Sequence, residues 1–160
     1  QVGKDTAGAW LVEHGWERLA FADLVRDVLY QMDPVVDPVS TEYYFTLKAM
    51  VDTMGWEMAK NNTEVRGLLQ KLGHGLREIL DPDVWCRPII KRAEDLDEDG
   101  INVVITDVRY FNEVMGIRHA GEEQLDEFQD WDGVIDNNGS TENLYRQVQD
   151  LVMDYTLDVD

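Results

Sequence analysis

Cysteine is nearly absent from this chain of 160 residues, which contains Cys86 alone. A lone cysteine excludes an internal disulfide and is typical of proteins that work in a reducing compartment, so we expect a cytoplasmic protein. No histidine or other base lies near Cys86 in the sequence. We therefore predict that it packs in the interior and does not act as a nucleophile.

Positive charge is also scarce. Lys and Arg total 14 against 33 Asp and Glu, which gives a formal net charge of -19 at pH 7. Such a surface repels nucleic acids and anionic membranes. No apolar run approaches the roughly 18 residues of a membrane span, and no signal peptide is recognisable. We expect no nucleic-acid or membrane partner, whereas a small anion could bind where the few cations converge.

Several catalytic and metal-binding patterns are missing as well. The three histidines, His14, His74 and His119, lack metal-ligand spacing, and no Ser-His-Asp pattern is recognisable. Residues 94–100 are acidic and predict a loop. This segment lacks the regular ligand spacing and the closing Glu of a calcium loop.

The sequence contains enough apolar residues, 44%, for one domain of ordinary size with a real core. Apolar spacing predicts a first helix that ends at Gly15 and further helices at residues 22–32, 43–54, 56–60, 64–80, 82–93 and 111–119. The helix at 82–93 is either interrupted or begun around Pro88. A last helix would be capped by Ser140. Strands are predicted at residues 17–21, 101–106 and 131–136. Residues 34–38 predict a loop.

The first segment, Q-V-G-K-D-T-A-G, is similar to the second half of a phosphate-binding loop, G-x-x-x-x-G-K-[ST]. Gly3 would let the backbone approach phosphates and Lys4 would reach the β and γ oxygens. Asp5 stands where a magnesium-binding hydroxyl is usual, and Thr6 follows. The alternative is a plain helix start that Asp5 and Thr6 merely cap.

A second motif, I-N-V-V-I-T-D-V-R-Y-F-N-E, covers residues 101–113. Asp107 follows a strong strand, and Arg109 lies two residues further on. Ligands of open α/β sheets bind beyond the carboxyl ends of strands. An acid and an arginine at that point suit magnesium and a transferring phosphoryl group. A surface Asp–Arg pair is the alternative.

Together these segments resemble the deoxynucleoside monophosphate kinases of tailed bacteriophages, within the P-loop nucleoside monophosphate kinases. The matching stretches occur in order along nearly the whole chain: G-K-D-T-A-G (3–8), R-L-A-F-A-D (18–23), G-W-E-x-A-K (55–60), E-V-R-G-L-L-Q-K-L-G (64–73), D-V-W (83–85), T-D-V-R-Y-F-N-E (106–113) and V-I-D-N-N-G (134–139).

The resemblance implies an α/β class fold, a three-layer α/β/α P-loop kinase domain over residues 1–160 with a parallel central sheet. A helical monophosphate-binding region would be inserted at about residues 34–93 and a lid near residues 118–122. The implied reaction transfers the γ-phosphate of ATP, with Mg²⁺, to a deoxynucleoside monophosphate for phage DNA synthesis in the host cytoplasm.

The resemblance also implies roles for individual residues. Gly3, Lys4, Asp5 and Thr6 would hold the ATP phosphates and magnesium, with Asp107 as a further magnesium ligand. The catalytic residues would be Lys4, Asp5, Asp107 and Arg109. The monophosphate pocket would include Asp23, Arg26, Arg66, Gln70, Trp85 and Arg109, the adenine loop Asn138 and Gly139, and the lid Arg118.

Arg66 and Gln70 are four residues apart, so they share one helix face and could clamp a phosphate and a base edge. A solvated helix face is the alternative reading. Trp85 could stack on a base or lie in the core, and Asn138 and Gly139 also suit an ordinary turn.

The chain departs from the kinase pattern in two places. The first half of the phosphate loop and its strand are not seen before Gln1. The lid expected after Arg118 is not seen either, because the segment that ends at Gly121 continues directly into acidic residues from Glu122. We expect that chain is missing at both points. Two alternative functions stay open, a non-catalytic nucleotide-binding or assembly module and a small P-loop ATPase. The sequence also leaves open whether the protein forms a homodimer.

Overall fold

The computed structural model describes residues 3–36, 45–109, 113 and 133–157, with side chains in the last stretch as far as 153. The chain divides into two compact units. Unit 1 combines Gln1–Leu19 with Ile90–Asp160, and unit 2 is Ala20–Ile89. Unit 2 is therefore inserted into unit 1 along the chain. Its bounds differ from the inserted region at about 34–93 that the family resemblance implies.

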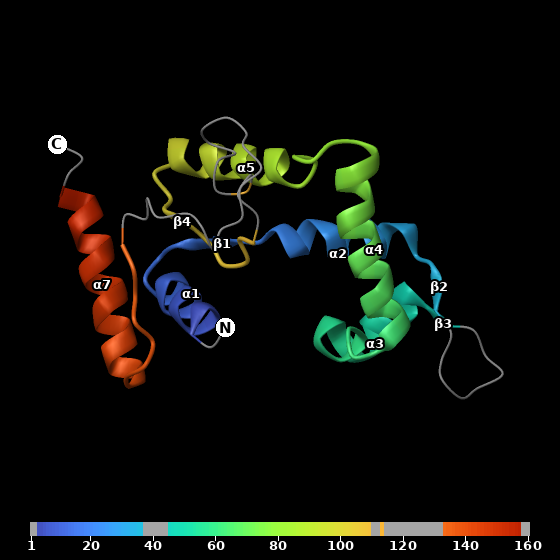
Figure 1. Ribbon diagram of the computed structural model, residues 1–160, viewed down its shortest axis with the longest axis horizontal. Coiled ribbons are helices and arrows are strands. Elements are labelled where there is room, and N and C mark those ends of the chain that lie inside the picture. The colour runs from blue at the N-terminus through green and yellow to red at the C-terminus, as the bar shows by residue number, and fades with distance from the viewer. Residues whose placement is uncertain (1–2, 37–44, 110–112, 114–132, 158–160) are drawn as a thin grey trace. The chain divides into compact units, whose positions relative to one another are not determined.

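Unit 1 contains a parallel strand pair (Figure 1). Strand β1 (Glu17–Leu19) pairs with β4 (Val103–Ile105), with Glu17 opposite Val103 and Leu19 opposite Ile105. The β-branched residues of β4 favour the extended backbone. The strands predicted at 17–21 and 101–106 are confirmed in shorter form. Parallel pairing brings the carboxyl ends of β1 and β4 to one edge.

Two helices of unit 1 form its core. Helix α1 (Lys4–Glu13) packs against α7 (Thr141–Leu157), as Figure 1 shows, and α1 also contacts both strands. Leu11, Leu144 and Val148 are buried between them. Leu144 and Val148 are four residues apart and so lie on one helix face. The first helix ends before Gly15, as predicted.

Helix α7 begins at a side-chain cap. Ser140 Oγ accepts a hydrogen bond from the Asn143 amide at 3.2 Å, which confirms the predicted cap. The pKa of Glu142 in the first turn is lowered, because its own backbone N–H and then the Ser140 hydroxyl hydrogen-bond to the carboxylate. A negative charge is also favourable at a helix N-terminus.

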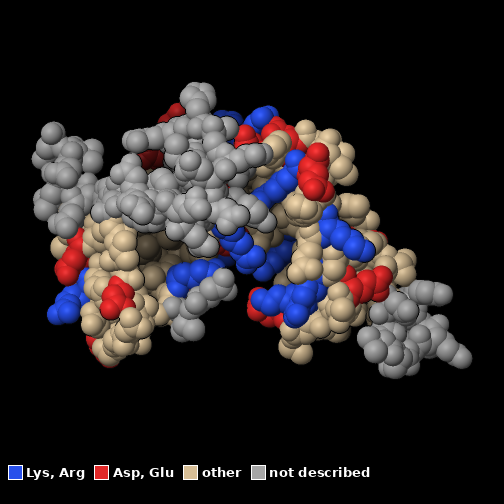
Figure 2. All heavy atoms as spheres, viewed as in Figure 1, with Lys and Arg blue, Asp and Glu red and all other residues tan. Residues whose placement is uncertain are grey.

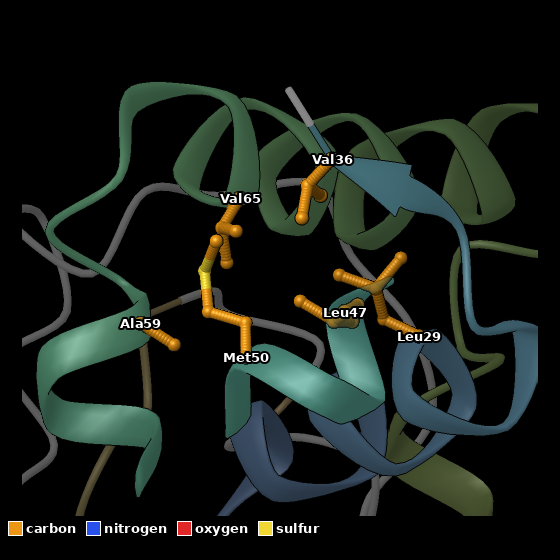
Figure 3. Close-up of a cluster of buried hydrophobic side chains, with 6 residues drawn as sticks. All are labelled: Leu29, Val36, Leu47, Met50, Ala59 and Val65. Carbon is orange, nitrogen blue, oxygen red and sulfur yellow. The ribbon is translucent and has the colours of Figure 1, made fainter. Parts of the chain in front are cut away.

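Unit 2 is built on three helices, α2 (Phe21–Met32), α3 (Leu47–Ala59) and α4 (Thr63–Ile79). Their apolar faces surround a cluster of buried side chains, which Figure 3 shows pointing toward one another: Leu29, Val36, Leu47, Met50, Ala59 and Val65. The helices predicted at 22–32 and 64–80 are confirmed. Close packing of α4 on α2 occurs at Gly73, where an added Cβ would lie 3.8 Å from the Val25 methyl groups.

Two short strands lie within the loop predicted at 34–38 and the helix predicted at 43–54, and residues 37–44 between them lie outside the described part of the chain. Strand β2 (Val35–Val36) pairs antiparallel with β3 (Phe45–Thr46). Both predictions were wrong for these residues, because two-residue strands are held by pairing with each other and carry no period of their own. Helix α3 then begins at Leu47, with Thr46 Oγ1 accepting from the Ala49 amide.

Gly55 interrupts α3, as the sequence predicts. Its φ of 75° and ψ of 162° lie outside the helical region, and glycine adopts such a backbone without the steric cost of a Cβ. The helix continues to Ala59 after this kink. The predicted segments 43–54 and 56–60 therefore become the two parts of one kinked helix that begins at Leu47.

Helix α5 (Cys86–Glu98) begins close to Pro88, one of the two predicted alternatives, and extends beyond the predicted end at residue 93. Residues 82–85 form a turn, and Pro88 lies in the first helical turn, where its missing N–H removes no intrahelical bond. The predicted acidic loop at 94–100 was wrong for residues 94–98, which are helical, whereas residues 99–100 form a turn. Lys91 Nζ bonds Asp95 at 3.1 Å, an i,i+4 pair that supports the helix.

The strand predicted at 131–136 is not formed over its described residues, 133–136. Only residue 113 of the predicted helix at 111–119 is described, and it is helical. The rest of that helix and the Gly121-Glu122 junction lie outside the described residues. The three-layer α/β/α fold stays a prediction. No helix in the described part has both the length and the apolar character to cross a membrane.

Helix α4 offers a direct test of helix capping. Asn62 Oδ1 accepts hydrogen bonds from the amides of Glu64 (2.8 Å) and Val65 (3.3 Å). We expect Asn62→Ala to lower the free energy of unfolding by about 1 kcal/mol, because these amides lose their acceptor. Urea denaturation measures it. The neighbouring substitution Asn61→Ala is the control, and an equal loss in both variants would contradict the cap.

Candidate functional site

The start of α1 holds the residues that were predicted to form a phosphate-binding loop. Gly3 precedes the helix with a φ of 115°, a left-handed value that favours glycine. Lys4 Nζ donates to Thr106 O at 2.9 Å and to Asp5 Oδ1 at 3.1 Å. Asp5 and Thr6 are exposed in the first turn. The structure therefore brings the lysine to the carboxyl end of β4, 102 residues away along the chain.

The end of β4 carries the second predicted pair. Asp107 is half-buried and Arg109 is exposed. The Arg109 backbone amide donates to Glu113 Oε2 at 2.6 Å, and Glu113 itself is buried, with 6% exposed. Sequence reasoning gave Glu113 no role of its own. Its carboxylate holds the backbone at Arg109 and thus the course of the chain after the strand.

A third segment, which contains Asn137, lies against the start of α1. An added Cβ on Gly3 would lie 2.3 Å from Asn137 Nδ2, so the Asn137 side chain packs directly against Gly3. The predicted adenine-loop residues Asn138 and Gly139 follow and are exposed. The Asn138 amide donates to Asp136 Oδ1 at 3.0 Å, which closes a turn of the kind that Asp favours.

Gln147 of α7 secures this turn, and sequence reasoning did not identify it. Its Oε1 accepts from the Asp136 amide at 2.9 Å, and its Nε2 donates to Asp136 O at 2.8 Å. The side-chain amide thus pairs with both backbone groups of one residue, as a neighbouring strand would. The sequence signal was weak, because the partners are 11 residues apart and lie on either side of a turn.

Unit 2 holds the residues that were predicted for the monophosphate pocket, apart from Arg109, which belongs to unit 1. Arg26 Nη1 donates to Asp23 Oδ1 at 3.0 Å, so these two form an ion pair on α2. Arg66 and Gln70 are both exposed on α4, one turn apart, while Val65 beside Arg66 is buried. Helix α2 packs on α4. The two predicted pairs therefore lie on helices that contact each other.

Trp85 is buried, with 4% exposed, and its Nε1 donates to Gly73 O at 2.9 Å. The indole thus fills space beneath α4 and satisfies its one polar group there. This geometry is that of a core residue, which is the second of the two places predicted for Trp85. Trp85 therefore helps to hold α4, the helix that carries Arg66 and Gln70.

Charge is distributed in small pairs. Figure 2 shows Lys and Arg side chains beside Asp and Glu side chains on the drawn face. Lys4 pairs with Asp5, and Arg26 pairs with Asp23. In the ranges that the structure describes, no three His, Cys, Asp or Glu side chains gather as a metal site. Arg118, the predicted lid residue, lies outside these ranges.

No protein-family model, no curated protein and no solved structure matches the chain.

Proposed function

We propose that the chain is a phosphotransferase that transfers the γ-phosphoryl group of ATP to a deoxynucleoside monophosphate in the cytoplasm of a phage host. A phosphate oxygen of the acceptor forms a bond to the γ phosphorus while the bond to the β,γ-bridging oxygen breaks. The products are ADP and the deoxynucleoside diphosphate. Such transfers depend on positioning and charge neutralisation more than on covalent chemistry by the protein.

The observation that carries this proposal is the hydrogen bond from Lys4 Nζ to Thr106 O, at 2.9 Å. It joins the start of α1 to the residue before Asp107, at the edge of the sheet where α/β proteins bind ligands. The first amides of α1 lack intrahelical partners and suit a phosphate group. A 46% exposed lysine beside them can move from a carbonyl oxygen to a phosphate oxygen.

The residues at this edge fit Mg²⁺. Asp107, Asp5 and Thr6 offer oxygen donors, the ligands that this ion prefers. Magnesium in phosphotransferases is usually held by one or two carboxylates, substrate phosphates and water, so a larger protein cluster is not needed. The ion would neutralise charge on the β and γ phosphates. Asp107 and Asp5 would hold it, while Lys4 binds the phosphate oxygens.

The acceptor would bind to unit 2. Arg66 presents a planar guanidinium that matches a phosphate with two parallel hydrogen bonds. Gln70, on the same face of α4, has an amide that can both donate to and accept from a base edge. The Asp23–Arg26 pair on α2 adds a second guanidinium held in a defined position.

The test is ADP release by the full-length protein with ATP, Mg²⁺ and each of the four deoxynucleoside monophosphates in turn. We expect at least one acceptor to stimulate turnover well above the rate with ATP alone. ATP hydrolysis that no acceptor stimulates would replace the proposal with an ATPase. Nucleotide binding without turnover would replace it with a non-catalytic module.

The role of Arg66 has its own test. We expect Arg66→Ala to lower kcat/KM for the acceptor about 10- to 100-fold, the value of a lost charged hydrogen bond of about 1.5–3 kcal/mol. Lys71→Ala removes the same charge from an exposed position on α4 and serves as the matched control. An equal effect of both substitutions would show that Arg66 contributes only general charge.

A further inference from the structure

Thr106 touches α1 at two points. Its carbonyl oxygen accepts the hydrogen bond from Lys4 Nζ, and its Cγ2 methyl lies where a Cβ on Gly8 would be only 2.6 Å away. The next nearest atom to that Cβ position is Thr106 Cβ, at 3.9 Å. A single methyl group therefore makes the whole close contact.

Thr106 is itself firmly placed. It is buried, with 9% exposed, and its amide donates to Leu19 O of β1 at 3.4 Å, which ties it to the sheet. Asp107 is the next residue. Thr106 thus connects the sheet, the helix α1 and the acid at the strand end.

Gly8 lies one helical turn after Lys4, so the two residues share a face of α1. Alanine is more favourable than glycine inside a helix, and Gly8 does not have one of the positive φ values that favour glycine. The physical reason for glycine at this position is the space that the Thr106 methyl occupies. A side chain there would push α1 away from the strand end.

We infer that Thr106 is a positioning residue, which together with Gly8 sets how deeply α1 lies against the end of β4 and thereby fixes Lys4 at the residue before Asp107. The inference rests on the proposed function, because phosphoryl transfer is the step in which that placement matters. Relieving a 2.6 Å contact to ordinary packing distance needs a shift of about 1 Å, enough to cost on the order of 100-fold in a positioned reaction.

The test is a double-mutant cycle of Gly8→Ala and Thr106→Ser. Serine removes Cγ2 and keeps the carbonyl and the hydroxyl. We expect Gly8→Ala to lower kcat about 30- to 100-fold with little change in the acceptor KM. Thr106→Ser alone should lower kcat less than Gly8→Ala does, because α1 loses the methyl group that it rests against but Lys4 keeps its bond to the carbonyl at position 106. The double variant should recover most of the kcat that Gly8→Ala loses.

Gly75→Ala is the control, because a Cβ at Gly75 of α4 meets nothing within 4 Å. We expect it to leave kcat unchanged. A Gly8→Ala variant as active as the parent protein, or a double variant no better than Gly8→Ala, would overturn the inference. If Gly8→Ala unfolds, the double variant should regain a cooperative melting transition, and failure to regain it would count equally against the contact.

A measurement without turnover separates this inference from the proposed function. Acetylation of Lys4 by an amine reagent, followed by mass spectrometry with Lys91 as internal reference, reports the hydrogen bond to Thr106. We expect Gly8→Ala to raise the relative rate about three- to tenfold, the value of one hydrogen bond, and Thr106→Ser to reverse the change in the double variant. An unchanged rate sinks the positioning role, whereas lack of acceptor-stimulated turnover in the parent protein sinks the proposed function alone.

Discussion

Lys4→Met is expected to lower acceptor-stimulated ADP formation by about 100- to 1,000-fold. Methionine keeps the unbranched side chain and removes the ammonium group that would neutralise the transferring phosphoryl group. Loss of one preorganised donor at developing negative charge has an effect of this size. The measurement is kcat and KM for both substrates at saturating Mg²⁺.

The fold is expected to survive this change. Lys4 is 46% exposed, and its pairing with Asp5 is of the exposed kind that contributes little to stability. Lys91→Met is the matched control, because Lys91 also pairs with a nearby acid in unit 1 and is exposed. A Lys4→Met variant that keeps turnover within about threefold of the parent protein would remove Lys4 from the mechanism.

Leu47→Ala is expected to cause the largest loss of stability, about 2–5 kcal/mol in the free energy of unfolding. Leu47 is fully buried, and Figure 3 shows it in the cluster with Leu29 and Met50. Truncation removes apolar contacts and leaves a cavity between helices. Urea denaturation followed by circular dichroism and tryptophan fluorescence measures the loss.

Met54 provides the control on the same helix. Its side chain is 46% exposed, so Met54→Ala removes little buried surface and should cost well under 1 kcal/mol. Comparable losses in the two variants would show that α3 is not held by the cluster around Leu47.

Much of the helical structure was predictable because its signals are local. The apolar spacing of α2 and α4 and the β-branched run of β4 lie within single segments. The interruption at Gly55 and the Ser140 cap likewise depend on residues close in sequence. The misjudged end of α5 has a local reason too, because acidic residues in 94–98 were interpreted as a loop although Glu is a good helix former.

Other features arise only from pairing between distant segments. Two-residue strands such as β2 and β3 have no sequence period, and each is extended because the other supplies its hydrogen bonds. Trp85 suited a stacking surface and a core position equally until its bond to Gly73 was seen. Gln147 carries no motif, and its hold on Asp136 depends on how α7 packs in unit 1.

The sequence by itself determined which residues carry groups suited to phosphate, magnesium and a monophosphate, because the chemistry of a lysine, a carboxylate or a guanidinium does not depend on its place in the fold. Tertiary structure decided which of them meet. It brought Lys4 to the residue before Asp107 and set Asn137 on Gly3, because the packing of α1 on β4 and α7 closes distances that run through most of the chain. It also explained the glycine at position 8, because only the folded chain places the Thr106 methyl group where a side chain at Gly8 would lie.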